Sequence, residues 1–194
     1  MAVRKILIAG HVGAGKTTAL RTLFGDTALT TDARYSERSD LDKSSTTVAM
    51  DYGVIDCPQT GDRLHLYAIP GQPRFQFMWE ILSKNVDALL LLMDAHIPKP
   101  LDAIHVYLDG ILPYIRNPVG VIALNKLKQE QRDQLQLPNY LRHGDLRLRL
   151  TTTDVRQKEE VMELLRLILG ELTQRPDLQL PLQVVGTGRE SPEN

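Results

Sequence analysis

The part of the sequence that best indicates the fold is Gly10-His11-Val12-Gly13-Ala14-Gly15-Lys16-Thr17, followed by Thr18. It matches the P-loop pattern Gly-x4-Gly-Lys-Ser/Thr at every fixed position. Glycines let such a loop wrap closely around phosphates and point its backbone N–H groups inward. The lysine then reaches the outer phosphates, and the threonine hydroxyl binds Mg²⁺. We therefore expect residues 10–18 to bind phosphate, with Lys16 in a catalytic role and Thr17 as a metal ligand.

The residues on either side of this segment have the patterns that a P-loop requires. Residues 3–9 become almost fully apolar from Ile6, as in a strand buried on both faces. Residues 17–24 are compatible with a helix that ends at Gly25. The N-terminus of that helix would add partial positive charge beside bound phosphates. A chance match in a glycine-containing turn is therefore the weaker interpretation.

Farther along the chain, strand-like and helix-like segments alternate, which is typical of an α/β sandwich around a mainly parallel sheet. We expect a P-loop NTPase three-layer sandwich whose six-stranded sheet contains one antiparallel strand. Residues 26–45 are polar and irregular, which predicts a long loop. Besides residues 3–9, the expected strands are residues 46–55 and 63–69, joined as a hairpin, then 87–93, 119–124 and a more exposed strand at 146–150. The remaining expected helices are residues 74–84, 101–115, 128–137 and 157–173.

The composition is that of an ordinary soluble domain of 194 residues, with 42% apolar and 24% charged residues. The formal net charge of −1 gives no support to nucleic acid or an anionic membrane as the main partner. The single cysteine, Cys57, excludes an internal disulfide framework and fits a reducing compartment. No leader follows Met1 and no apolar run reaches the ~20 residues of a membrane helix, so we expect a cytoplasmic protein. We expect one domain over residues 1–173 and a loose tail over residues 174–194.

Two later segments narrow the class of protein. Residues 44–51, Ser-Ser-Thr-Thr-Val-Ala-Met-Asp, enter a strand from the expected loop, and residues 67–72, Tyr-Ala-Ile-Pro-Gly-Gln, end the next strand. Together with the P-loop, these motifs resemble those of the Ras-like small GTPases, most closely the bacterial branch of the MglA-type proteins. The resemblance covers residues 3–172. It implies a Mg²⁺-dependent GTP-binding switch that hydrolyses GTP to GDP slowly, with switch I at about residues 26–51 and switch II at about residues 70–79.

The resemblance also assigns roles to individual residues. Thr47, or Thr46 one position earlier, would bind Mg²⁺ in switch I, and Gly71 would donate its backbone N–H to the γ-phosphate. Gln72 would be the catalytic residue that orients the attacking water. The residues at the guanine base would be Asn125, Lys126 and Thr152.

Two positions depart from the family pattern. Ala68 stands where most Ras-like proteins have an aspartate that supports Mg²⁺ through water, and Asp51 or Asp94 could substitute for it. Lys128 stands where an aspartate normally accepts hydrogen bonds from guanine N1–H and the 2-amino group. Because lysine offers donors where an acceptor is needed, the main source of guanine selectivity is missing, and Glu130 is a distant substitute.

Partner recognition is expected at switch II. Four large apolar residues, more than one buried helix face requires, follow the Pro-Gly-Gln motif; they are Phe75, Phe77, Met78 and Trp79. By resemblance, the partners would be a roadblock-type regulatory protein that stimulates hydrolysis, and effector proteins.

Other features of the chain bear on regulation. The sequence does not identify an arginine of this chain that would act on the γ-phosphate. Arg38 and Arg74 are the candidates. Ala2 replaces the glycine that myristoylation needs, and no cysteine lies near residue 194, so we expect no lipid anchor.

Two other classes of protein remain open. A degenerate GTPase-fold scaffold would bind nucleotide weakly and would not hydrolyse it, an interpretation that Ala68 and Lys128 favour. A P-loop kinase or ATPase would use Asp94, at the end of the apolar run 88–93, as its Walker B aspartate. Such an enzyme usually needs an arginine-rich lid, and the arginines of residues 142–149 are the candidates for one.

Overall fold

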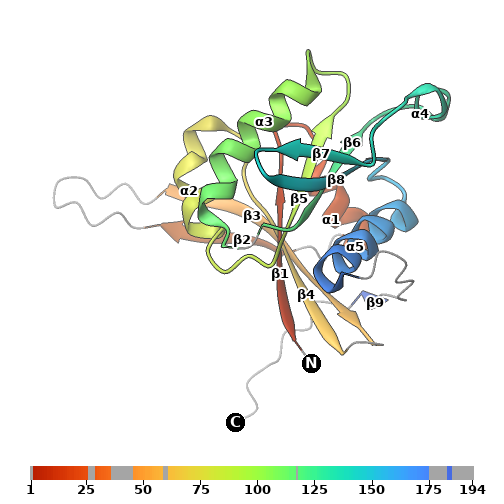
Figure 1. The fold of residues 1–194 in the computed structure, drawn as a ribbon. Coiled ribbons are helices and arrows are strands. Elements are labelled where there is room, and N and C mark those ends of the chain that lie inside the picture. Colours follow the sequence, from red (N-terminus) through yellow and green to blue (C-terminus); the bar gives the residue numbers. More distant parts are fainter. Residues whose placement is uncertain are drawn as a thin grey trace, which may run out of the picture.

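The computed structural model describes residues 2–25, 29–35, 46–58, 61–116, 118–174 and 183–184. They form an α/β fold in which a mixed sheet lies between helices (Figure 1). The strands are β1 (Val3–Ala9), β2 (Leu29–Tyr35), β3 (Thr46–Cys57), β4 (Asp62–Ala68), β5 (Ala88–Asp94), β6 (Gly120–Asn125), β7 (Tyr140–His143), β8 (Leu146–Thr153) and β9 (Gln183–Val184). The helices are α1 (Lys16–Phe24), α2 (Gln76–Leu82), α3 (Pro100–Ile111), α4 (Gln129–Gln134) and α5 (Lys158–Thr173), with short 3-10 turns at Pro73–Phe75 and Leu112–Tyr114.

The centre of the sheet agrees with the sequence-based expectation. The strands follow the order β2-β3-β4-β1-β5-β6-β8-β7, and β4, β1, β5, β6 and β8 are parallel to one another. The strand β3 runs antiparallel to β4, which confirms the predicted hairpin. The expected count of six strands was too small, because β2, β7 and β9 also pair with the sheet, each in antiparallel orientation.

Two segments differ from their predictions. Residues 29–35, expected within a long loop, form β2 along the first half of β3. Residues 146–150, expected as an exposed strand, begin β8, which lies inside the sheet between β6 and β7. In both cases backbone hydrogen bonds hold the strand to its neighbours in the sheet. The periodicity of the side chains in the sequence gives no sign of this pairing. In the expected tail, Gln183–Val184 pairs with β3 at Ile55 and Asp56.

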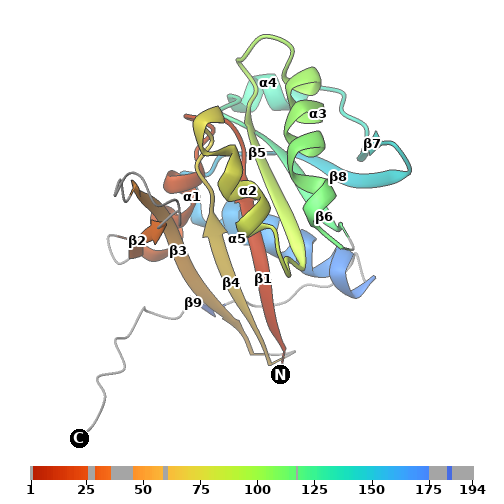
Figure 2. The ribbon, with the colours of Figure 1, turned by 90° about the vertical axis from the view of Figure 1, so that its left-hand side faces the viewer.

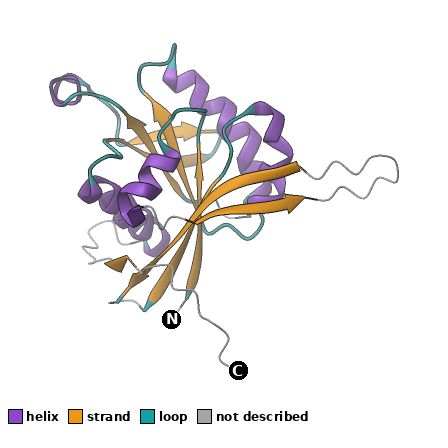
Figure 3. Cartoon of the chain, turned by 180° about the vertical axis from the view of Figure 1, so that it is seen from behind, coloured by secondary structure: helices purple, strands orange, loops and turns teal. Residues whose placement is uncertain are grey.

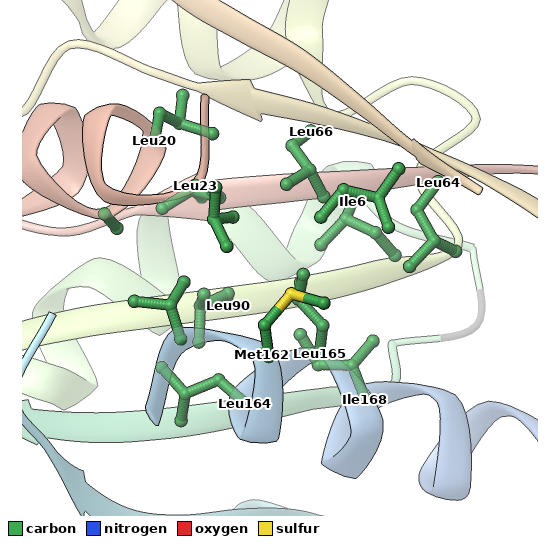
Figure 4. Close-up of a cluster of buried hydrophobic side chains, with 14 of the residues drawn as sticks. Ile6, Leu20, Leu23, Leu64, Leu66, Leu90, Met162, Leu164, Leu165 and Ile168 are labelled. Carbon is green, nitrogen blue, oxygen red and sulfur yellow. The ribbon is translucent and has the colours of Figure 1, made fainter. Parts of the chain in front are cut away.

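Helices cover both faces of the sheet (Figure 3). Alternate residues of β1 point to opposite faces, so Ile6 and Ile8 join one apolar cluster while Leu7 and Ala9 join another. The first cluster contains the buried apolar side chains of α1 and α5 (Figure 4), and the second contains Trp79 of α2 and the buried residues of α3. The fully buried central strands explain the near-continuous apolar runs of the sequence.

The parallel strands place their carboxyl ends at one edge of the molecule, opposite the amino end of β1 (Figure 2). The loops that follow β1, β5, β6 and β8 therefore meet at that edge, where open α/β sheets bind ligands. None of the helices in the described ranges has both the length and the apolar character needed to cross a bilayer.

Candidate functional site

The loop of residues 10–17, called the glycine-rich loop below, connects β1 to α1 at the carboxyl edge of the sheet. Gly10 and Gly15 have φ angles of 137° and 108°, which other residues rarely adopt. A side chain at Gly10 would collide with the carbonyl of Leu92 on β5, and one at Gly15 would approach Asn125 Nδ2 to 2.5 Å. The two glycines thus let the loop lie directly on its neighbouring strands, with the N-terminus of α1 beneath it.

Lys16 lies inside this loop. Its Nζ donates hydrogen bonds to the carbonyl oxygens of Gly10 at 2.7 Å and of His11 at 2.8 Å. Burial lowers the pKa of the Lys16 ammonium to about 8, and the Asp51 carboxylate opposes this shift. The protein therefore only partly stabilises the charged form of Lys16, and an anion beside it would supply the negative charge that stabilises this form further.

A pocket of about 200 Å³, called pocket A, lies beside Lys16. The sequence-predicted residues that the structure brings together around it are Val12, Gly13, Lys16, Thr17, Gly71 and Gln72. Asp51 and Ala68 also line it, and the two residues lie opposite each other in the β3–β4 register. A carboxylate absent from β4 is thus supplied by the adjacent strand at the same level of the sheet.

Asp94, the other candidate substitute, has different partners. Its Oδ2 accepts a hydrogen bond from Lys126 Nζ at 2.7 Å, and its Oδ1 accepts one from the backbone N–H of His96 at 2.9 Å. Burial raises the pKa of this carboxyl, but the bonds from Lys126 and His96 outweigh burial and lower it overall. Asp94 therefore orients the lysine of the Asn-Lys pair, whereas Asp51 faces pocket A.

The backbone of Gly71 packs tightly against the glycine-rich loop. A Cβ atom at this position would lie 2.6 Å from the carbonyl carbon of His11 and 2.8 Å from Lys16 Nζ. The Gly71 carbonyl accepts a hydrogen bond from Tyr107 Oη at 3.2 Å, and the Pro70 carbonyl accepts one from Trp79 Nε1 at 3.1 Å. The two successive peptides that follow Pro70 and Gly71 are thus bonded to α2 and α3, and Gly71 packs against Lys16 on the other side.

A second pocket of about 380 Å³, called pocket B, lies on the other side of Gly13. Asn125 joins its walls, because Nδ2 donates to the Ala14 carbonyl at 2.9 Å and Oδ1 accepts from the Val155 N–H at 3.3 Å. A smaller hollow formed by Gly13, Gly15, Lys16, Thr17 and Thr18 shares residues with both pockets. The lining of pocket B also includes Gly15, Thr18, Lys126, Asp154 and Arg156.

Some predicted base-site residues lie elsewhere. Thr152 is a β8 residue paired with Leu124, and the following residues 154–156 line pocket B in its place. Lys128 and Glu130 are exposed at the start of α4. Sequence reasoning assigned no side-chain role to Asp154 or Arg156, although a polar residue directly after a parallel strand is a signal for this edge of the sheet.

Other predicted residues fall partly or wholly outside the described structure. The Thr46 and Thr47 backbones begin β3, but their side chains are outside the described part, as is Arg38. Arg74 is exposed, with its guanidinium carbon 4.7 Å from the centroid of the Phe75 ring.

The apolar residues after Gln72 divide between core and surface. Met78 and Trp79 are buried, and Phe75 is half-buried. Phe77 and Ile81 are each 42% exposed. Of the four apolar residues after Gln72, Phe77 is thus the exposed one, and Ile81 on the same helix is equally exposed.

A larger hollow of about 790 Å³ lies near the amino end of β1. Its lining includes Arg4, whose guanidinium is within 3.5 Å of Asp87 and 3.9 Å of Asp62. This hollow lies away from the glycine-rich loop, and the chemistry argued below belongs to pockets A and B.

Comparison with known proteins gives little additional information. No family profile matches the sequence. An uncharacterized protein of Methanocaldococcus jannaschii, MJ1339, is 28% identical over 91 residues, which are 47% of this chain and 51% of that protein. The match thus spans about half the length of this relative, whose name assigns it no activity.

Proposed function

We propose that this protein is a GTP-binding molecular switch of the Ras-like type that hydrolyses GTP to GDP slowly, and that residues 10–17 act as its P-loop. The observation that carries the proposal is pocket A, where a partly buried lysine, a threonine, a glycine and a glutamine line the same hollow. These four groups come from two segments more than 50 residues apart in sequence, α1 with its preceding loop and the segment after β4. Their meeting supports a site for a phosphoryl group and a water molecule.

In this proposal each residue of pocket A has a defined task. Lys16 and the backbone of the glycine-rich loop bind the outer phosphates, and the Gly71 N–H donates to the terminal one. The Gln72 side chain orients a water molecule for attack on the γ-phosphorus, which breaks the bond to the bridging oxygen and leaves GDP and inorganic phosphate. Pocket B, joined to pocket A through Gly13, would receive the nucleoside.

The hard oxygen donors that Mg²⁺ prefers are present in pocket A, because the Thr17 hydroxyl and the Asp51 carboxylate both line it. Thr17 would be the direct ligand, with Thr47 as the second by resemblance. When bound, Mg²⁺ supplies charge that neutralises the phosphates. Asp51 would support the ion through water in place of the aspartate missing at position 68.

The switch would operate through the segment after β4. Because Gly71 packs against Lys16, a γ-phosphate next to Lys16 changes the surroundings of the 70–71 peptide, and hydrolysis reverses the change. A roadblock-type regulator and effectors in the cytoplasm would read this change at the exposed Phe77 and Ile81. The kinase or ATPase alternative is less favoured, because Asp94 is paired with Lys126.

Phosphate release from GTP tests the proposed activity. Purified full-length chain in excess over GTP, with Mg²⁺, is expected to release phosphate slowly, and Gln72→Ala to lower the single-turnover rate by about 100-fold, the cost of misplacing one reactant. The measurement is phosphate release over hours with binding of GTP followed in parallel. Gln134→Ala, which truncates an exposed glutamine of α4, is the matched control and should hydrolyse GTP normally. A wild-type chain that binds GTP but releases no phosphate would contradict the enzyme and favour the scaffold.

Asp51→Ala is expected to raise the Mg²⁺ concentration needed for tight nucleotide binding by about tenfold or more, as loss of a supporting ligand usually does. The nucleotide dissociation rate, measured across a Mg²⁺ titration, reports the effect without requiring hydrolysis. Asp56→Asn is the control, since Asp56 lies on the same strand but pairs with Arg63 at 2.7 Å. An unchanged Mg²⁺ dependence in Asp51→Ala would show that Asp51 has no part in supporting the ion.

A further inference from the structure

Pocket B contains a carboxylate, that of Asp154, although the sequence has a lysine at position 128, where the family pattern places the aspartate that binds the base. The residue that departs from the family pattern, Lys128, is exposed and forms the N-cap of α4, where its backbone N–H donates to Gln131 Oε1 at 2.9 Å. Asp154, which follows β8, lines pocket B together with Asn125 and Lys126. Its side chain is only 14% exposed.

The Asp154 loop is held in place by buried and charged contacts. The Asp154 N–H donates to Glu160 Oε2 at 2.6 Å, and Arg132 Nη1 donates to the same oxygen at 2.7 Å. On the other side, Val155 N–H donates to Asn125 Oδ1. The position of the Asp154 backbone therefore depends on α4, α5 and β6 together, which gives the carboxylate a fixed place in the pocket wall.

The Asp154 carboxylate is ionised and holds a replaceable partner. Its Oδ1 accepts from the backbone N–H of Arg156 at 3.0 Å and from Arg156 Nε at 2.8 Å, and its Oδ2 accepts from Arg156 Nη2 at 2.7 Å. These bonds from Arg156 lower the pKa of the Asp154 carboxyl. The Arg156 side chain is 75% exposed, so it can move into solvent and leave its place at the carboxylate to a ligand.

We propose that Asp154 is the guanine-selecting residue of this protein, taking the place of the aspartate absent at position 128. Its carboxylate accepts hydrogen bonds from guanine N1–H and the 2-amino group in pocket B, while the Arg156 guanidinium moves aside into solvent. Adenine has no donor at either position, so it leaves the carboxylate unpaired and is rejected. This inference rests on the proposed nucleotide-binding function and names the base that the site takes.

Replacement of one carboxylate oxygen of Asp154 by an amide nitrogen tests the assignment directly. Asp154→Asn is expected to lower the affinity for GDP by about 10- to 100-fold, the loss of a charge-assisted hydrogen bond to a base. The same variant should bind xanthosine diphosphate more tightly than the wild type does, because the xanthine 2-oxo group accepts a hydrogen bond from the asparagine amide. Calorimetric titration of the full-length chain with GDP, xanthosine diphosphate and ADP, each with Mg²⁺, measures all three affinities.

The gain for xanthosine diphosphate separates base recognition from structural damage, because a damaged loop would weaken binding of every nucleotide. Arg156→Ala should keep or improve the preference for GDP over ADP, since it frees the carboxylate. Lys128→Ala should bind all three nucleotides as the wild type does. A wild type that binds GDP and ADP equally, an Asp154→Asn variant that keeps its GDP preference and does not gain xanthosine diphosphate, or a Lys128→Ala variant that loses the preference would each overturn the inference. A wild type that binds none of the three would instead refute the proposed function itself.

Discussion

Lys16→Ala is expected to lower the affinity for GTP and GDP by about 100-fold or more, the loss of two charge-assisted hydrogen bonds to phosphate. The lysine is the one cationic side chain among the residues that line pocket A, so no neighbouring side chain of that lining can replace it. Calorimetric titration with GDP and a nonhydrolysable GTP analogue measures the loss. The fold should survive, because within the described residues Lys16 Nζ donates its hydrogen bonds to the loop carbonyls of Gly10 and His11. Arg21→Ala, on the exposed side of the same helix, is the matched control.

The pH dependence of binding gives this prediction a second measurement. Because the pKa of Lys16 is lowered to about 8 in the free protein and phosphate would raise it, binding takes up a proton above pH 8. Affinity should therefore not change with Lys16 ionisation below pH 8, and should fall by up to about tenfold for each pH unit above it. The Lys16→Ala variant should lack this fall. If the variant binds GDP as tightly as the wild type does, residues 10–17 do not act as a P-loop.

Asn125→Ala is expected to lower the free energy of unfolding by about 2 to 4 kcal/mol, because it leaves both the Ala14 carbonyl and the Val155 N–H without their side-chain partner. Asn125 is 2% exposed, so water cannot easily reach these groups. Since the residue also joins the walls of pocket B, nucleotide affinity should fall as well. Chemical denaturation measures the first effect and calorimetry the second.

Thr153→Val is the matched control for this prediction. Thr153 pairs with Asn125 in the β6–β8 register and is equally buried, but its hydroxyl has no hydrogen-bond partner in the structure. Replacing such a hydroxyl should leave stability unchanged or raise it slightly. An Asn125→Ala variant as stable as Thr153→Val would mean that the two hydrogen bonds of Asn125 contribute no measurable stability.

Local signals in the sequence were enough to predict the glycine-rich loop and the central strands. The apolar run of β1, the glycines and Lys16 are neighbours in sequence, so their pattern carries the geometry with it. The edge strand β2 could not be predicted this way, because its seven residues pair with β3 through backbone groups. No apolar alternation marks such a strand.

The details of the site depended on contacts between distant segments. Asp51 was one of two candidates for the missing carboxylate, and only the β3–β4 register, which places it opposite Ala68, distinguished it from Asp94. The sequence pattern assigned Asp154 no side-chain role at the base. Its place in pocket B follows from the contact of β6 with β8 and from the bond between Asn125 and Val155, neither of which a single segment encodes.

The hydrogen bond from Trp79 Nε1 to the Pro70 carbonyl couples the intrinsic fluorescence of the protein to this segment. The chain has one tryptophan, so all of its indole emission comes from the ring that holds the 70–71 peptide. Tyr107 of α3 holds the next peptide, through the Gly71 carbonyl, and its ring centroid lies 5.3 Å from that of Trp79. A rearrangement beside Lys16 that moves Gly71 therefore also changes the surroundings of these two aromatic rings. Intrinsic fluorescence can therefore follow the loop in real time, with no label attached to the protein.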